Sequence, residues 1–174
     1  PKVLARAEEG LADASPREQA YVRALQHWAK GDPGAAARVG EEILADHPLD
    51  LLAMRLAHHT YFYLGAAGDM LGSIERIISA WDESIPGYGF VLGMRAFALE
   101  ESGDYTAAEE SGRAAVNIDV VNPWAIHAVA HVMEMQDRHS EGIDWITGLE
   151  THWNAANNFR YHLWGHRALM HLDR

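Results

Sequence analysis

The chain of 174 residues carries a formal net charge of −11, with 14 lysine and arginine residues and no cysteine. Binding a nucleic-acid backbone requires clustered basic side chains, so this charge argues against a nucleic-acid partner. The lack of cysteine excludes a disulfide framework and thiolate metal sites. It also favours a reducing compartment, so we expect a cytoplasmic protein. No apolar run is long enough to span a membrane, so we expect no membrane partner.

A turn signal recurs along the chain at a nearly constant interval. Gly-Asp occurs at 31–32, 68–69 and 103–104, and Asp137-Arg138 takes its place in a fourth turn. The steps between the second residues of these turns are 37, 35 and 34 residues. A period near 34 with helical patterning is typical of stacked helical hairpins, which bury their apolar faces against one another. The sequence therefore predicts an all-α, right-handed α-solenoid with one concave surface.

Capping residues and prolines predict where the helices begin and end. Ser15-Pro16 followed by Glu18 marks one helix start, and Asn122-Pro123 marks another. We expect a weaker helix within residues 1–14 and a last helix after Asn157-Asn158, in about four and a half hairpins. The whole of 1–174 is expected to be a single domain of a longer protein. The helix pairs are predicted at about 16–30 with 33–47, 49–64 with 69–81, 88–101 with 104–117, and 123–136 with 139–153.

Several strings resemble a known repeat family. Gly103-Asp104-Tyr105, with the small residues Ala96 and Ala108 on either side, resembles the turn of a tetratricopeptide repeat. The string Asn-Pro-Trp-Ala-Ile-His-Ala-Val-Ala-His-Val-Met-Glu at 122–134, with Tyr-His-Leu-Trp-Gly-His at 161–166, is similar to the tetratricopeptide repeat protein 38 family. This resemblance covers most of the chain. It implies tetratricopeptide-like helix-turn-helix repeats and no particular catalytic activity.

Histidine is unusually frequent, with 11 residues in the chain. His127 and His131 are four residues apart on one predicted helix, and so are His162 and His166. This spacing places two imidazoles on one helix face, where they can chelate a divalent metal ion. If the end of the chain is matched to the turn at Asp137-Arg138, the second pair falls one residue from the groove positions and packs between helices instead.

Aligning the turns relates the first histidine pair to another part of the chain. With Arg138 matched to Asp69, His127 has the same position in its repeat as His58. The resemblance to tetratricopeptide repeats implies that this position lines the concave groove. His58 or the adjacent His59 is therefore expected to share one cavity with the pair at 127 and 131.

Three interpretations of these histidines remain open. They are polar groove or core residues with hydrogen-bonded neighbours, ligands of a metal such as zinc, or part of a site for acid–base catalysis or small-molecule recognition. His127 and His131 are the metal candidates, although Ala128 stands where metalloproteases with His-Glu-x-x-His have glutamate. The candidate groove or ligand residues are His58, His59, Tyr63, Arg95, Trp124, His127, His131, Glu134, His162 and His166.

Other conspicuous side chains are expected to be structural. Trp28 and four further tryptophans stand beside apolar residues at helical spacing, which predicts packing between helices. The acidic pairs Glu100-Glu101 and Glu109-Glu110 predict a solvated helix face.

Two classes of function follow. Helical repeats commonly hold a peptide or helix of a partner protein in their groove, so the first expectation is an interaction or scaffold module. The alternative is a small-molecule-binding protein or an enzyme with a histidine-lined cavity, in which a divalent metal such as zinc would be the only cofactor.

Overall fold

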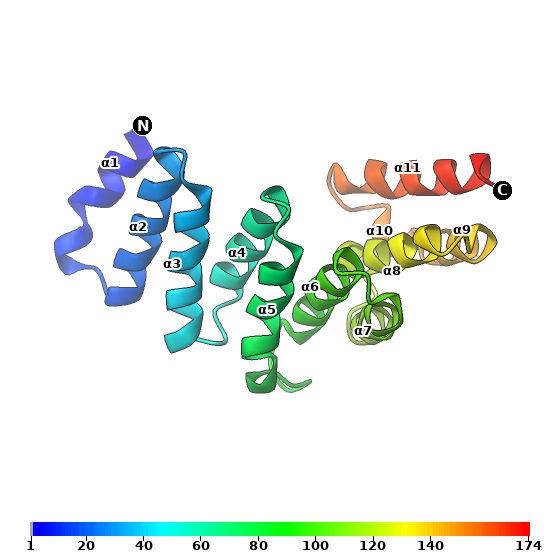
Figure 1. Ribbon diagram of the computed structural model, residues 1–174, viewed down its shortest axis with the longest axis horizontal. Coiled ribbons are helices and arrows are strands. Elements are labelled where there is room, and N and C mark those ends of the chain that lie inside the picture. The colour runs from blue at the N-terminus through cyan, green and yellow to red at the C-terminus, as the bar shows by residue number, and fades with distance from the viewer. Residues whose placement is uncertain (1) are drawn as a thin grey trace. The chain divides into compact units, whose positions relative to one another are not determined.

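The structure, a computed structural model, describes residues 2–174 (Figure 1). Helices make up 78% of the chain, and the described part contains no strand, which confirms the all-α prediction. None of the helices described is both long and apolar enough to cross a bilayer. The chain divides into two compact units, one ending at Trp81 and the other beginning at Asp82. The prediction of a single domain stays a prediction.

The first unit is built from two consecutive helix pairs preceded by a short helix. α2 packs on α3, α3 on α4, and α4 on α5, as predicted for stacked hairpins. A 3₁₀ turn at Leu11–Asp13 ends the region predicted as one weak helix, and another at Ile78–Ala80 extends the last helix. The helices are α1 (Lys2–Glu9), α2 (Pro16–Ala29), α3 (Pro33–Asp46), α4 (Leu51–Tyr63) and α5 (Ala67–Ile77).

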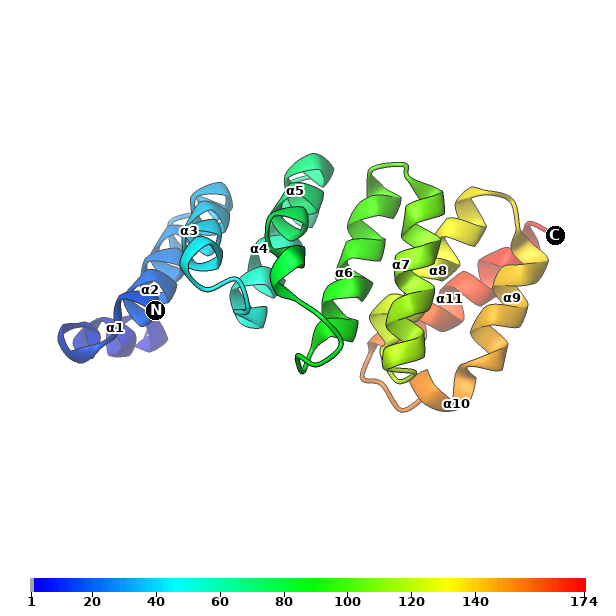
Figure 2. The same cartoon turned by 90° about the horizontal axis from the view of Figure 1, so that it is seen from below.

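The second unit contains two further pairs and the terminal helix. α6, α7 and α8 pack on one another, while α11 lies against α8 and α9 (Figure 2). The helix predicted over 139–153 is divided, because the chain turns at Leu149 between α9 and α10. The helices are α6 (Tyr88–Glu101), α7 (Tyr105–Ile118), α8 (Pro123–Met135), α9 (His139–Gly148), α10 (Glu150–Trp153) and α11 (Phe159–Leu172).

Side chains at the helix starts confirm the predicted caps. Ser15 Oγ accepts a hydrogen bond from the Glu18 N–H at 3.3 Å, and the Glu18 carboxylate accepts one from the Ser15 N–H at 2.8 Å. This reciprocal capping box begins α2. Asn122 Oδ1 accepts hydrogen bonds from two backbone N–H groups of α8, and its amide nitrogen donates to the carbonyl of Gly89. Asn122 therefore both starts α8 and fixes it to α6.

The second turn differs from the prediction by three residues. Positive φ angles occur at Gly31, Gly65, Gly103 and Asp137, so Gly65 rather than Gly68 occupies the left-handed position of that turn. A left-handed residue ends a helix at low cost only where glycine, or more rarely aspartate or asparagine, is present. α5 accordingly begins earlier than predicted, and the additional residues of this repeat lie between α5 and α6.

This shift changes which histidines are equivalent. Counted back from the corrected turn, His59 has the repeat position of His131, and His58 has that of a buried alanine. The predicted equivalence of His58 and His127 is therefore wrong. His58 lies in the interior of the first unit, with only 1% of its surface exposed.

Small residues allow the helices of the second unit to approach closely. Ala96, Ala108, Ala115 and Ala130 have no exposed surface, as expected for the close helix crossings. A Cβ atom on Gly112 of α7 would lie 2.5 Å from a methyl carbon of α8, which leaves no room for a side chain there. Residues of small volume therefore set the spacing between α6, α7 and α8.

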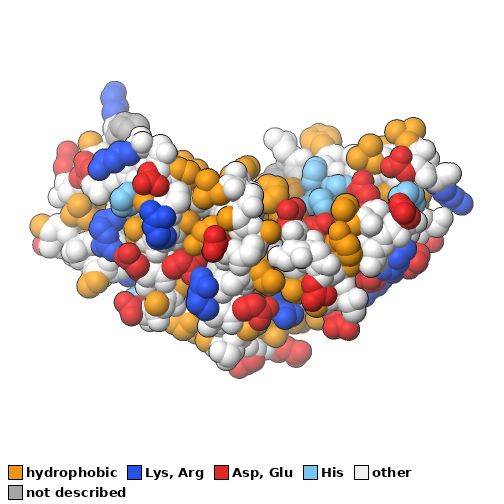
Figure 3. Space-filling model, viewed as in Figure 1, with side chains coloured by type: hydrophobic (Ala, Val, Ile, Leu, Met, Phe, Trp, Pro, Cys, Tyr) orange, Lys and Arg blue, Asp and Glu red, His pale blue; other side chains and the backbone are white. Residues whose placement is uncertain are grey.

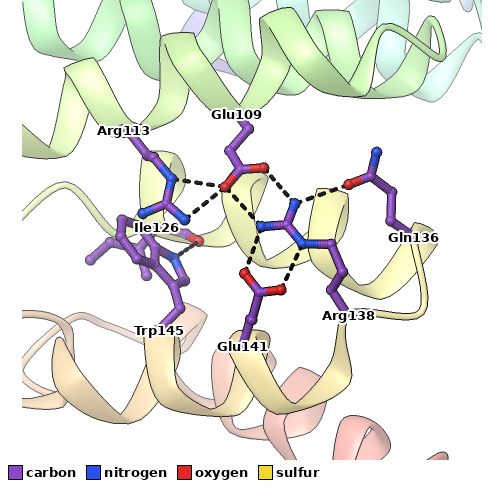
Figure 4. Close-up of polar contacts among 7 residues, drawn as sticks. All are labelled: Glu109, Arg113, Ile126, Gln136, Arg138, Glu141 and Trp145. Carbon is purple, nitrogen blue, oxygen red and sulfur yellow. Dashed lines mark hydrogen bonds and ion pairs between the residues drawn. The ribbon is translucent and has the colours of Figure 1, made fainter.

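Arg138 joins the turn before α9 to a neighbouring helix (Figure 4). Its guanidinium donates hydrogen bonds to Glu109 of α7 at 2.6 Å and to Glu141 of α9 at 2.8 Å. Arg113 also donates to Glu109, at 2.8 Å. These hydrogen bonds, that from Arg138 foremost, lower the pKa of Glu109. Glu109, predicted to lie on a solvated face, instead connects α7 with α9.

Replacing Ala108 with leucine is expected to destabilise the second unit. The side chain of Ala108 is fully buried, so the added carbons would overpack the crossing and cost about 1–3 kcal/mol. Thr106 is exposed on the same helix, which makes Thr106→Leu the matched control. Urea unfolding followed by circular dichroism gives both free energies of unfolding. Equal stability of the wild type and Ala108→Leu would contradict the packing described.

A second prediction concerns the pH dependence of stability. Burial, together with the nearby His59 and Arg55, lowers the pKa of His58 to about 3. In the unfolded chain this imidazole titrates near the usual value of about 6.5, so below that pH the unfolded state takes up a proton that the folded state does not. Stability is therefore lost as the pH falls below 6.5.

The loss assigned to His58 is about 2 kcal/mol between pH 7 and pH 5. We expect His58→Gln to remove this part of the pH dependence, as measured by urea unfolding at both pH values. His47 is exposed in the same unit, so His47→Gln should show the same pH dependence of stability as the wild type. An unchanged pH dependence in His58→Gln would show that this histidine is not buried as a neutral ring.

Candidate functional site

Four histidines of the second unit form a cluster between two helices. His127 and His131 come from α8, and His162 and His166 come from α11. The four-residue spacing puts each pair on one helix face, as predicted, and α11 packs against α8 so that the pairs meet. One ring nitrogen from each histidine lies within 4.8 Å of the other three. Figure 3 shows a group of histidine side chains, in pale blue, at the surface of this unit.

The Nε2 atoms of this histidine cluster form a continuous series of close contacts. Nε2 of His162 lies 2.8 Å from Nε2 of His127 and 3.1 Å from Nε2 of His166. Nε2 of His131 lies 3.1 Å from Nε2 of His166. His162 and His166 thus lie between α11 and α8, where both rings meet the histidines of α8. His127 and His166 are buried, whereas His162 is exposed, so the cluster is reached from one side.

Aromatic rings surround the buried end of the cluster. The ring centroid of His127 lies 5.7 Å from that of Phe97, 5.5 Å from that of Trp124 and 5.1 Å from that of Phe159. These rings come from α6, α8 and α11. Trp124 was a predicted site residue, whereas both phenylalanines carry no sequence signal that separates them from core residues. Together the rings exclude water from the side of His127 that faces away from solvent.

Two glutamates contact the outer ring nitrogens. Oε2 of Glu134 lies 2.7 Å from Nδ1 of His166, and Oε2 of Glu100 lies 3.6 Å from Nδ1 of His131. Glu134 was a predicted site residue. Glu100 was predicted to lie on a solvated face, which is wrong, because it is 6% exposed and lies on the face of α6 that packs against α8.

Burial favours the neutral form of the imidazoles. Desolvation lowers the pKa of His127 well below its usual value, and the neighbouring histidines lower it further. Desolvation also lowers the pKa of His162 and of His166, although Glu134 opposes the shift of His166. At neutral pH these rings therefore present lone pairs rather than positive charges.

The remaining predicted residues lie elsewhere in their units. Tyr63 is 75% exposed at the end of α4, with its ring centroid 6.4 Å from that of His59. Arg95 of α6 lines a shallow polar depression with Glu110 of α7. The functional roles predicted for His58, His59, Tyr63 and Arg95 stay predictions.

A second candidate site is an apolar groove in the first unit. The groove lies between α2 and α4, with residues of α3 as its floor, and has a volume of about 430 Å³. Leu25 and Trp28 of α2 are 50% and 51% exposed, and Leu52 and Leu56 of α4 are 57% and 48% exposed. The prediction that Trp28 packs between helices is wrong. Sequence reasoning missed this groove because its residues have the same helical spacing as core residues.

The polar groups of this apolar groove already have partners. The Tyr21 hydroxyl donates a hydrogen bond to the Asp50 carboxylate, which also caps α4. The Thr60 hydroxyl donates to the carbonyl of Leu56 at 2.7 Å. The other lining residues contribute hydrocarbon and the aromatic ring of Trp28. The groove therefore presents an apolar surface to its surroundings.

Comparison with known proteins establishes the fold. No family model matches the chain. A crystal structure of MamA superposes with a TM-score of 0.62 at 16% sequence identity, covering 83% of this chain and 80% of that one. MamA 41-end from Desulfovibrio magneticus RS-1 superposes with a TM-score of 0.66 at 14% sequence identity, covering 90% of this chain and 87% of that one. MamA AMB-1 superposes with a TM-score of 0.58 at 18% sequence identity, covering 92% of each chain. The chain therefore has a tetratricopeptide-like helical repeat fold.

Proposed function

We propose that this chain is a protein-interaction module that binds an amphipathic helix of a partner protein in the apolar groove between α2 and α4. The observation that carries the proposal is the exposure of four large apolar side chains along one groove, Leu25, Trp28, Leu52 and Leu56. Contiguous exposed apolar surface of this kind marks interaction sites, and buried aromatic anchors supply much of the energy of an interface.

The chemistry of the groove favours a helix over an extended peptide. An extended segment must satisfy its own backbone N–H and C=O groups with hydrogen bonds from the groove. The hydroxyls of Tyr21 and Thr60 are already engaged, and the helices that form the walls bond their own backbones. A bound helix satisfies its backbone internally and needs only an apolar face. The partner segment therefore presents apolar residues at i, i+3 or i+4, and i+7.

Membership of the tetratricopeptide repeat protein 38 family is part of the same proposal. The string at 122–134 that supports it supplies Trp124, His127, His131 and Glu134. The alternative function, ligand binding at the histidine cluster, depends on residues of the second unit and is tested separately.

A library of helical peptides with randomised apolar positions tests the groove. Peptides selected on the full chain are expected to carry the helical apolar spacing and to bind Leu56→Glu at least tenfold more weakly, because the new carboxylate would be desolvated against apolar side chains. Fluorescence anisotropy of a labelled selected peptide measures the change.

Leu64 provides the matched control for this experiment. It is 48% exposed, like Leu56, but does not line the groove. Leu64→Glu should therefore bind the peptide as the wild type does. Selection of extended, proline-containing peptides, or equal binding by Leu56→Glu and Leu64→Glu, would refute the proposed docking mode.

A further inference from the structure

We propose that His127, His131, His162 and His166 together bind one divalent transition metal ion, with zinc as the ion that fits best. This inference goes beyond the helix-binding groove and depends on other residues. It extends the pair expected from sequence, His127 and His131, to a complete set of four ligands from two helices.

Glu134 determines which ring nitrogen of His166 is protonated. A carboxylate accepts hydrogen bonds and donates none, so Glu134 requires the proton of a neutral His166 on Nδ1. Nε2 of His166 is then an acceptor with one lone pair. Nε2 of His131 and Nε2 of His162 each lie 3.1 Å from it.

One lone pair accepts a hydrogen bond well from only one of these two rings, and a neighbouring nitrogen that also carries a lone pair is repelled. A metal ion resolves the conflict, because it accepts lone pairs from several imidazoles at once. A carboxylate on the far nitrogen of a ligating histidine is also the usual partner in metal sites, where it fixes the ring orientation.

The distances fit a metal ion of the size of zinc. With Zn–N bonds of about 2.0–2.1 Å, neighbouring nitrogens of a tetrahedral site lie about 3.3 Å apart. The three Nε2 contacts of 2.8, 3.1 and 3.1 Å are close to this value, and the ligand nitrogens of all four rings lie within 4.8 Å of one another, so binding would draw the more distant rings inward. Four imidazoles complete a tetrahedron, and closed sites of this kind stabilise structure. The ion would therefore fasten α11 to α8.

The charge around the site also fits a divalent ion. Imidazoles bind a metal ion in their uncharged form, whereas Glu134 and the buried Glu100 bring two carboxylates to the outer side of the cluster. A dication offsets both. The rings of Phe97, Trp124 and Phe159 exclude water beside His127, which strengthens these interactions.

Zinc titration of the chelator-treated full chain, followed by calorimetry at neutral pH, tests the proposal. The wild type should bind one equivalent. His162 is exposed, so His162→Ala should leave the packing intact while binding zinc at least tenfold more weakly. The double variant His162→Ala, His166→Ala should show no stoichiometric binding. His171 is exposed on the same helix, and His171→Ala is the control that should match the wild type.

Cobalt(II) in place of zinc reports the coordination directly. A four-coordinate site gives intense visible absorption, whereas a hydrated six-coordinate ion gives weak bands. We expect intense bands for the wild type and their loss in His162→Ala. Glu134 is a positioning residue, so Glu134→Gln should weaken zinc binding about 10–100-fold while the bands remain.

Three results would overturn the metal site. They are no stoichiometric zinc binding by a wild-type chain with a helical circular dichroism spectrum, equal affinity of His162→Ala and His171→Ala, and weak cobalt bands in the wild type. The groove variant Leu56→Glu should bind zinc normally, which keeps this test separate from that of helix binding.

Discussion

The close approach of α8 to its neighbours is the constraint on which the second unit depends. A Cβ atom on Gly93 of α6 would lie 3.2 Å from Cβ of Ala125, and one on Gly112 of α7 would lie 2.5 Å from a methyl carbon of Val129. The face of α8 toward α6 and α7 therefore has room only for small or close-fitting side chains. His127 and His131 lie beside this tight crossing, next to Phe97 and Glu100 of α6 and facing the histidines of α11. The small residues therefore set how closely α6 and α8 hold these two rings.

This arrangement carries an energetic cost that other contacts offset. Burying an imidazole or a carboxylate is unfavourable unless each polar atom finds a partner. Nδ1 of His166 is hydrogen-bonded to Glu134, and the Nε2 atoms of the cluster lie close to one another between α8 and α11. The buried Nδ1 of His127, however, has no hydrogen bond. A core of leucine and alanine would hold α11 to α8 without these costs. Four converging imidazoles therefore carry a desolvation cost that packing of α11 on α8 does not require.

Local signals in the sequence predicted the helices well because local forces determine them. The capping box at Ser15 and the cap at Asn122 act within a few residues of the helix starts, so they can be identified without knowledge of the fold. The turn after α4 was misplaced because Gly65 and Gly68 both suit a left-handed residue, and only the packing of the whole hairpin decides between them. The helix content was predictable, whereas the register of that repeat was not.

The candidate site was predictable only as two separate halves. Helical spacing shows that His127 and His131 share a face, but the meeting of α8 and α11 depends on how the helices pack. Glu100 is a sharper example. Its position beside a second glutamate is typical of a solvated face, and only the contact of α6 with α8 reveals that it is buried near His131. Contacts between distant segments carry this information, and no short window of sequence contains it.

The repeat also explains how one fold carries two chemically different surfaces. Counted back from the turns after α2 and α8, Tyr21 and Leu25 occupy the same repeat positions as His127 and His131. In the first unit these positions line the apolar groove, and in the second they carry two histidines of the cluster. The backbone geometry that presents these positions is set by caps, turns and small residues elsewhere in the hairpin. The side chains placed there are therefore free to differ, and they decide whether the face is apolar or lined with imidazoles.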